Sequence, residues 1–445
     1  MALIFSRLGF WLAWLLIPIL FEFLPTCSYF LRLRFFKKIA PPSESLSYFP
    51  YITVIVPVYN SEKTLYKCLA SLNDSTYPNS SMQIIVANNH STDQSFAVFE
   101  RARHNFNRLN LQWLETDPGK ARALNAAIYN ARGKYILNID SDGFLEKNAL
   151  LNIVTRFEND AQILALTGTI LINKELIKQT KSWKLRFLQA NEYFEYTRAF
   201  LTGRQIESAK NQLFTLSGAF SAFRKETLFQ TFLYNPQTVG EDTEITFQIR
   251  TKLKGKIVLC PNAIFYAEPI ESLAALYLQR QRWQRGQIET AQAFMQENAD
   301  LKTFFSNFMI RKMMIDHTFI FCRIIWVFGL FVLVYLGYSP LLLACSLGLL
   351  YLLYIFNEFL NLLVALHFLR DFPKEKTYLR HKAWCCLTIP FYNLLCALIR
   401  LLGIINSITF PAKWRAQEFS SEWSQVTTIV KKDLKHLAQR KDQHE

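Results

Sequence analysis

Two carboxylates, one residue apart, are the first feature of the sequence that could do chemistry. Asp140 and Asp142 follow the apolar run 134–139, whose pattern predicts a strand. In open α/β sheets, ligands bind beyond the carboxyl ends of the strands. Two carboxylates at such a place could hold a divalent cation, which would in turn bind phosphate oxygens. The D-x-D spacing is common on loops, so this interpretation depends on the motifs that accompany it.

A glycine and a lysine open a helix that is predicted over 119–131. Lys120 directly follows Gly119, so the lysine lies beside backbone N–H groups that have no partner within the helix. Such a helix start suits a diphosphate, because both the N–H groups and the ammonium group favour anions. The alternative for Lys120 is an ordinary solvated lysine.

A second helix start is acidic. Gly240-Glu241-Asp242 precedes a predicted helix, and a carboxylate at this place could act in the chemistry. The alternative is simpler, because acidic residues in the first turn stabilise a helix on their own.

A polar and aromatic motif lies further downstream, on a helix predicted over 271–295. At helical spacing, Gln279, Arg282 and Trp283 share one face of this helix. The alternative for the motif is an amphipathic helix that lies on a membrane surface.

The elements that must position these residues alternate between strands and helices. This alternation predicts an α/β fold with a mostly parallel sheet that is covered on both faces. Strands are predicted over 52–58, 83–87, 111–115 and 134–139, and helices over 61–72, 92–104, 119–131 and 146–157.

The composition of the 445 residues excludes a disordered protein, because 51% are hydrophobic and only 19% are charged. The net charge of +15 could suit nucleic acid, but no zinc-ligand pattern, basic helix or RNA-binding motif supports that partner. Basic residues that flank membrane segments explain the charge better. The eight cysteines form no C-x-x-C pair, so the sequence predicts free thiols and neither a zinc site nor a disulfide framework.

Apolar runs that could span a membrane lie near both ends of the chain, over 8–31, 315–337, 340–369 and 384–409. Lys37 and Lys38 follow the first run, so the positive-inside rule puts the next residues in the cytoplasm. We expect an uncleaved anchor rather than a signal peptide, because the run is long and no A-x-A site follows it. The last run either spans the membrane, which makes four spans, or lies in the interface, which leaves three.

Four ionisable residues lie inside these apolar runs: Glu22, Arg323, Glu358 and Arg400. Charges in such positions are costly and face a protein interior or a wet path. They could line a channel for a sugar polymer, or they could pair helices with one another.

Taken together and in this order, D-x-D, E-D and Q-x-x-R-W resemble the motifs of the membrane-bound family 2 glycosyltransferases. That group includes the cellulose, hyaluronan and poly-N-acetylglucosamine synthases, and the sequence also resembles a Gram-positive, exosortase-associated subgroup. The resemblance covers about 51–300 and implies a GT-A fold. The segment 216–220, with Arg224 shortly after it, looks like the acceptor-site segment of the family.

The resemblance implies a role for each motif. Asp242 would be the general base, and Trp283 would stack on the acceptor sugar. The acceptor site would also include Ser217, Gly218, Glu241 and Gln279. The donor would be bound by Lys120, Asp140, Asp142 and Arg282, with Mg²⁺ or Mn²⁺ as the cofactor and Asp142 as its direct ligand.

One departure from the family pattern concerns the nucleotide. The family usually has paired aspartates after the second strand, one of which helps to bind uracil, whereas this sequence has Asn88 and Asn89. An asparagine can bond a base but brings no charge. Asn88 is the candidate base contact, and a UDP-sugar remains the expected donor.

The resemblance also implies a domain organisation. It consists of an N-terminal transmembrane anchor (1–38), a linker (39–50), a cytoplasmic GT-A domain (51–300), an interfacial segment (301–312), a C-terminal membrane bundle (313–409) and a polar tail (410–445).

Three functions remain open from the sequence. The first is an inverting, processive synthase that extends a polysaccharide at the cell membrane. The second is a non-processive enzyme that glycosylates a lipid, because ceramide glucosyltransferases share the motif pattern. The third is a catalytically dead subunit. The expected partners are a nucleotide-sugar, a glycan or lipid acceptor and membrane lipids, without nucleic acid.

Overall fold

The computed structural model describes residues 19, 23–35, 46–297, 308, 329, 331–337 and 339–409. Most of the predicted spans over 8–31 and 315–337 therefore lies outside the described residues. The same holds for Glu22, Arg323 and the polar tail.

The first half of the sheet has the strands that the sequence predicts. β1 (Ile52–Val58), β2 (Met82–Asn88), β3 (Asn110–Glu115) and β4 (Tyr135–Ile139) lie in the order β3-β2-β1-β4, and all of them are parallel. Every residue of β1, β2 and β4 is buried, as expected for strands that are covered on both faces. The helices between them are α3 (Leu65–Asn73), α4 (Ser95–Asn105) and α5 (Lys120–Asn130), with the short η2 (Asn79–Ser81) before β2.

The second half of the sheet is mixed, and the sequence did not predict its directions. It comprises β5 (Gly143–Leu145), β6 (Ile163–Ile172), β7 (Phe220–Arg224) and β8 (Lys256–Ala267), which continue the order as β4-β7-β6-β8-β5. β7 runs antiparallel to both β4 and β6, and β5 runs antiparallel to β8. Four of the seven described strand pairings are still parallel, so the α/β fold class is confirmed.

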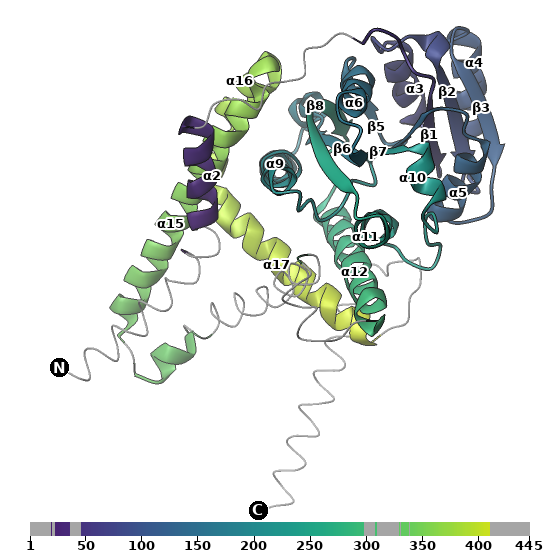
Figure 1. The fold of residues 1–445 in the computed structure, drawn as a ribbon. Coiled ribbons are helices and arrows are strands. Elements are labelled where there is room, and N and C mark those ends of the chain that lie inside the picture. Colours follow the sequence, from purple (N-terminus) through teal and green to yellow (C-terminus); the bar gives the residue numbers. More distant parts are fainter. Residues whose placement is uncertain are drawn as a thin grey trace, which may run out of the picture.

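Helices cover both faces of this sheet (Figure 1). α3, α4 and α6 (Ala149–Glu158) bury residues such as Leu69, Phe99 and Ile153 in one core. α5, α10 (Lys225–Phe229) and α11 (Glu241–Lys252) bury residues such as Leu124 and Ile245 in a second core on the other face. The two faces are fixed by the alternation of side chains along the strands.

The remaining helices connect the sheet to the C-terminal part of the chain. They are α7 (Lys174–Gln179), α8 (Trp183–Tyr196), the π-helical η3 (Thr197–Gly203), α9 (Arg204–Ala209) and the long α12 (Leu273–Glu297). α12 confirms the helix predicted over 271–295.

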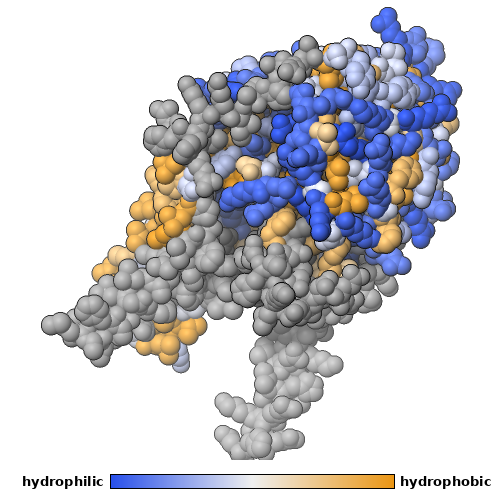
Figure 2. All heavy atoms as spheres, viewed as in Figure 1, coloured by the Kyte–Doolittle hydropathy of each residue, from blue (hydrophilic) through white to orange (hydrophobic). Residues whose placement is uncertain are grey.

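Two described helices are long and apolar enough to cross a membrane, over Pro340–Asp371 and Cys385–Leu402. They belong to α15 (Pro340–Phe368) with η4 (Leu369–Asp371), and to α17 (Cys385–Thr409), which continues through Pro390. α16 (Pro373–His381) connects them, and α2 (Leu24–Phe35) packs on α15. Figure 2 shows apolar atoms along α15, in contrast to the hydrophilic surface over the sheet.

Ion pairs that are buried or partly buried join the C-terminal helices to the rest of the chain. Lys174 pairs with Glu375 of α16, and Arg198 of η3 pairs with Glu358 of α15. Arg400 donates a hydrogen bond to Gln284 of α12 at 2.7 Å. Glu358 and Arg400 therefore join helices to one another, which is the structural alternative given above. The cysteines of the described residues are all free thiols, as predicted.

Candidate active site

Lys120 lies among the carboxylates that meet at the carboxyl edge of the sheet. Its ammonium group donates a hydrogen bond to Asp140 at 2.6 Å and lies 3.8 Å from the carboxylate of Glu241. The three residues come from the start of α5, the end of β4 and the start of α11. Burial acts to lower the pKa of Lys120, but the two carboxylates outweigh it and raise that pKa above its ordinary value.

Asp242 belongs to the same cluster, one residue further into α11. Its Oδ2 accepts a hydrogen bond from the backbone N–H of Gly218 at 3.1 Å, and its Oδ1 accepts one from the N–H of Thr243 at 2.7 Å. A Cβ atom on Gly218 would lie 3.4 Å from Asp242 Oδ2 and 3.7 Å from Lys120 Nζ. The backbone of Gly218 therefore lies beside both groups, within van der Waals reach of each.

The glycine is held in turn by neighbouring strands. Its carbonyl oxygen accepts a hydrogen bond from Asn138 Nδ2 at 3.0 Å. Ser217 is buried, and its backbone N–H donates to the hydroxyl of Thr167 at 3.2 Å. The segment before β7 is thus fixed from both sides. The cluster combines five of the predicted site residues from four segments of the chain: Lys120, Asp140, Gly218, Glu241 and Asp242.

Crowding raises the pKa values of two carboxylates here. Burial has the largest effect on Glu241 and raises its pKa. Lys120 acts to lower the pKa and the charge of Asp242 acts to raise it, and the resulting pKa is about 7. Asp142 is an exposed residue, but neighbouring protein atoms desolvate its carboxylate, and this desolvation and then the charge of Asp140 raise its pKa to about 6. Ser141 between the two aspartates is buried, and its hydroxyl bonds that of Ser61 at 2.7 Å.

This pair of aspartates fits a cation that binds together with a substrate. In the ranges that the structure describes, no three His, Cys, Asp or Glu side chains are arranged to hold a metal ion by themselves. Asp140 and Asp142 offer hard oxygen donors that repel each other, and a cation would relieve that repulsion. Mg²⁺ and related ions are held by one or two carboxylates plus substrate phosphates, which matches this donor set.

The start of α5 depends on a glycine. Gly119 has φ +126°, a backbone conformation that residues other than glycine rarely adopt. Its N–H donates to Asn89 Oδ1 at 2.5 Å, which ties the start of α5 to the loop after β2. Lys120 is thereby aimed at Asp140.

Asn88 ends β2 and lies beside a carboxylate that the sequence analysis missed. Its Nδ2 donates to Glu115 at 2.7 Å, and its Oδ1 accepts from the N–H of Ser91 at 3.0 Å. Glu115 also accepts from the indole N–H of Trp113 at 2.7 Å. The charge that Asn88 lacks is therefore supplied by the end of β3. Parallel register between β2 and β3 was the signal that could have found it.

Trp283 lies in an aromatic group on α12, α8 and η3. Its ring is 6.1 Å from that of Tyr196 and 5.9 Å from that of Phe200, measured between centroids. Gln279 donates to the hydroxyl of Tyr196 at 3.2 Å, so Gln279 and Trp283 share a face as predicted. Trp283 is 39% exposed, which leaves ring surface for a ligand. The sequence analysis missed Phe200, because it is the π-helical η3 that places this ring beside Trp283.

Arg282 is exposed on α12. The buried arginine of the motif is Arg280, which lies 4.3 Å from the centre of the Trp283 ring and pairs with Glu195. A role for Arg282 on a diphosphate stays a prediction.

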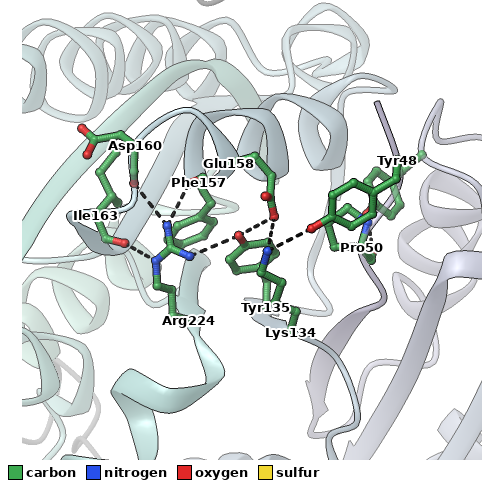
Figure 3. Close-up of polar contacts among 10 residues, drawn as sticks. Tyr48, Pro50, Lys134, Tyr135, Phe157, Glu158, Asp160, Ile163 and Arg224 are labelled. Atoms are coloured by element: carbon green, nitrogen blue, oxygen red, sulfur yellow. Dashed lines mark hydrogen bonds and ion pairs between the residues drawn. The ribbon is translucent and has the colours of Figure 1, made fainter. Parts of the chain in front are cut away.

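Arg224 does not lie with the segment before β7, which corrects the expectation that linked them (Figure 3). In the register of β7 against β4, Arg224 lies opposite Tyr135, at the far end of the strand from Phe220. Its guanidinium group donates hydrogen bonds to the backbone carbonyl oxygens of Ile163 at 2.7 Å, Phe157 at 2.8 Å and Asp160 at 3.2 Å. It also donates to the hydroxyl of Tyr135 at 3.2 Å. Arg224 stabilises the fold at the opposite edge of the sheet.

Residues 53–230 match the model of the family described as glycosyl transferase family 2. This segment is a family 2 glycosyltransferase domain. It includes the D-x-D motif and the start of α5, whereas α11 and α12 lie beyond the match. The match supports, for this segment, the family that the sequence motifs predicted.

Two relatives from Staphylococcus aureus are named for related activities. The chain is 29% identical over 217 residues to poly(ribitol-phosphate) beta-N-acetylglucosaminyltransferase TarS, covering 42% of this chain and 36% of that one. It is 26% identical over 290 residues to poly-beta-1,6-N-acetyl-D-glucosamine synthase, covering 64% of each. The chain thus spans less than two thirds of the length of either relative.

The fold is also similar to a solved structure. Mannosyltransferase PcManGT from Pyrobaculum calidifontis, in complex with GDP-Man and Mn²⁺, superposes with a TM-score of 0.53 over 87% of this chain and 95% of that one, at 17% identity. The GT-A type of fold expected for the glycosyltransferase domain is thereby confirmed.

Proposed function

We propose that the protein is an inverting glycosyltransferase that transfers a sugar from a UDP-linked donor to a growing polysaccharide at a membrane. The observation that carries the proposal is the cluster in which Asp242, Gly218, Lys120 and Asp140 meet. An inverting transfer needs a base on the acceptor side and positive charge on the side of the leaving group. The cluster offers both within one edge of the sheet.

In the proposed reaction, Asp242 removes the proton of the acceptor hydroxyl. The acceptor oxygen attacks the anomeric carbon of the donor while the bond from that carbon to the diphosphate oxygen breaks. Lys120 and the N-terminus of α5 offset the negative charge that develops on the leaving nucleoside diphosphate. The proton stays on Asp242 until the product leaves.

Asp140 and Asp142 would hold Mg²⁺ or Mn²⁺, with Asp142 as the direct ligand. The cation, when bound, offsets the charge of the diphosphate. We expect EDTA to abolish sugar transfer, because the two aspartates and the diphosphate would then repel one another, and we expect added Mg²⁺ or Mn²⁺ to restore it. Full activity in chelator would exclude the metal role.

On the acceptor side, Trp283 would stack on a sugar ring with the part of its surface that is exposed. Gln279, Glu241 and Ser217 would complete the acceptor site, and Arg282 would contribute to binding the diphosphate. Asn88 and Glu115 together offer an N–H donor and a carboxylate acceptor, which suit the edge of a uracil ring.

The donor and the membrane location follow from further observations. Both relatives from S. aureus are named for N-acetylglucosamine, so UDP-N-acetylglucosamine is the first donor to test. The membrane is supported by the two candidate spans and by the exposed ring of Trp384 at the start of the second one. This ring stacks on Phe187 at 5.4 Å, with Lys382 close by, as in a membrane interface.

We also propose that residues 51–300 form a cytoplasmic catalytic domain and that 313–409 form a multi-pass membrane bundle. Protease added outside sealed cells should then spare 51–300. Cleavage within that stretch in intact cells would contradict the orientation.

A non-processive transfer to a lipid is the second candidate, because only two candidate spans occur among the described residues. The full chain, purified with lipid, should release UDP when given UDP-N-acetylglucosamine. A ladder of labelled product would support the polysaccharide, and a single lipid-soluble product would support the second candidate. No incorporation from any nucleotide-sugar would contradict both.

A further inference from the structure

A glycine in the turn before α11 and a glycine in α12 touch through their backbones beside the proposed active site. Gly240 precedes α11, and Gly286 lies within α12. A Cβ atom on Gly240 would lie 2.6 Å from the carbonyl oxygen of Gly286, and a Cβ on Gly286 would lie 2.8 Å from the Cα of Gly240. Both separations are too short for real atoms, and the neighbours are backbone atoms that cannot turn away. The turn before α11 and the helix α12 therefore approach so closely at this point that neither position has room for a Cβ atom.

A carboxylate on α12 bonds to the same turn. Glu289 Oε2 accepts hydrogen bonds from the backbone N–H of Val239 and from the hydroxyl of Thr238, both at 3.0 Å. The Thr238 oxygen accepts in turn from the N–H of Gly240 at 3.1 Å. Arg285 donates to the other oxygen of Glu289 at 2.9 Å. Glu289 thus orders residues 238–240, the turn that leads into α11.

The turn 238–240 leads to Asp242, and α12 carries Trp283; these are the two groups on which the proposed transfer depends. Asp242 follows Gly240 by two residues, so a shift of the turn moves this carboxylate. Trp283 precedes Gly286 by three residues and therefore lies on the same face of α12. One contact between the turn and α12 then sets how far Asp242 lies from the aromatic surface that would hold the acceptor.

We propose that Gly286 and Glu289 are positioning residues that hold Asp242 at its working distance from the acceptor. This inference rests on the proposed roles of Asp242 and Trp283. Neither Gly286 nor Glu289 lies within the matched family segment, and neither is part of the Q-x-x-R-W motif. Their effect acts through the base and the aromatic ring, so neither is a catalytic residue.

Glu289 can be tested with a conservative variant. Glu289→Ala should lower kcat for transfer roughly 10–100-fold, the cost of misplacing a reacting group by a fraction of an ångström to an ångström. Affinity for UDP and the Tm of the purified full chain should change little. Glu289→Gln should retain most of the rate, because its amide oxygen can still accept from Val239 and Thr238. Glu100→Ala, which removes an exposed surface ion pair on α4, is the control.

Gly286 offers an independent test. Alanine is the better helix former, so Gly286→Ala would leave the protein as stable or more so if nothing crowded it. We expect instead a loss of kcat of roughly tenfold or more, since the turn must move away from α12. Gly348→Ala in α15 is the matched control, because a Cβ there meets no atom within 4 Å. This variant should keep the wild-type rate.

The outcomes separate this inference from the proposed function. If Asp242→Asn is inactive while Glu289→Ala and Gly286→Ala both transfer at the wild-type rate, the positioning role is wrong and the proposed base stands. If Glu289→Ala loses UDP affinity or Tm in proportion to activity, Glu289 only stabilises the fold, which also overturns the inference. If Asp242→Asn keeps its rate, Asp242 is not the base, and the proposed mechanism fails together with this inference.

Discussion

The carboxyl edge of the sheet and the opposite edge differ in how their charged side chains are paired. At the carboxyl edge, Asp142 and Glu241 are crowded by other carboxylates, and their pKa values are raised to about 6 and about 7. At the opposite edge, Glu158 and Arg224 each have several hydrogen-bond partners within the protein. Burial acts to raise the pKa of Glu158, but hydrogen bonds from Lys134 and Tyr135 outweigh it and lower that pKa.

The difference separates residues that bind from residues that hold the fold. Arg224 and Glu158 use their hydrogen-bonding groups within the protein, so little is left for a ligand (Figure 3). The carboxylates around Lys120 carry more negative charge than one lysine offsets. Such a site favours the arrival of a cation, and proteins commonly sacrifice stability at sites of this kind.

The largest effect on stability is expected at the edge opposite the active site. Arg224→Met should lower the free energy of unfolding by about 3 kcal/mol, because several buried acceptors lose their donor at once. Thermal unfolding of the purified chain measures this loss. Arg103→Met, which removes an exposed pair with Glu100, should change Tm little. A Tm for Arg224→Met equal to that of the control would contradict the structural role.

A smaller effect, with a defined pH dependence, is expected for Glu158. Because its pKa is lowered in the folded state, the stabilisation is present above the ordinary carboxyl pKa and is lost as pH falls through the folded value. Glu158→Gln should therefore be less stable than wild type by about 1 kcal/mol at pH 7. The difference in Tm should shrink as the pH falls below about 4. A difference that stays constant with pH would show that the carboxylate charge is not involved.

The smallest effect on stability is expected at the carboxyl edge, where a substitution should raise Tm rather than lower it. Asp142→Asn removes one of two repelling charges, so it should raise Tm in metal-free buffer by about 2 °C, with solvent limiting the gain at this exposed position. The same variant should lose donor binding in the presence of Mg²⁺. A lower Tm in metal-free buffer would mean that Asp142 supports the fold, and the contrast between the two edges would fail.

Much of this organisation could be predicted from local patterns. The four parallel strands and the helices between them follow from apolar runs bounded by polar turns, and their predicted ends agree with the structure within a few residues. Asp140, Lys120 and Asp242 were found because each lies directly at the end of such an element. The parallel order β3-β2-β1-β4 then places the residues that follow β3 and β4, Lys120 and Asp140, at one edge.

The rest depends on contacts between distant residues, which local patterns do not carry. Arg224 bonds carbonyl oxygens that come 61 to 67 positions earlier in the chain, so its sequence neighbours suggested the wrong site. Glu115 became visible as a partner of Asn88 only through the pairing of β2 with β3. The contact of Gly240 with Gly286 has no sequence signal, because a glycine alone does not show what approaches it.

The most direct test of the account is a paired measurement on Asp242→Asn. Asparagine keeps the shape and can still accept from Gly218, but it cannot take a proton. Sugar transfer should fall about 10²–10⁴-fold, while UDP affinity, measured on the same purified sample by calorimetry, should stay near the wild-type value because the diphosphate contacts lie elsewhere. Transfer at a near wild-type rate would show that Asp242 is not the base. Loss of UDP binding together with transfer would place Asp242 in the donor site and contradict the separation of roles.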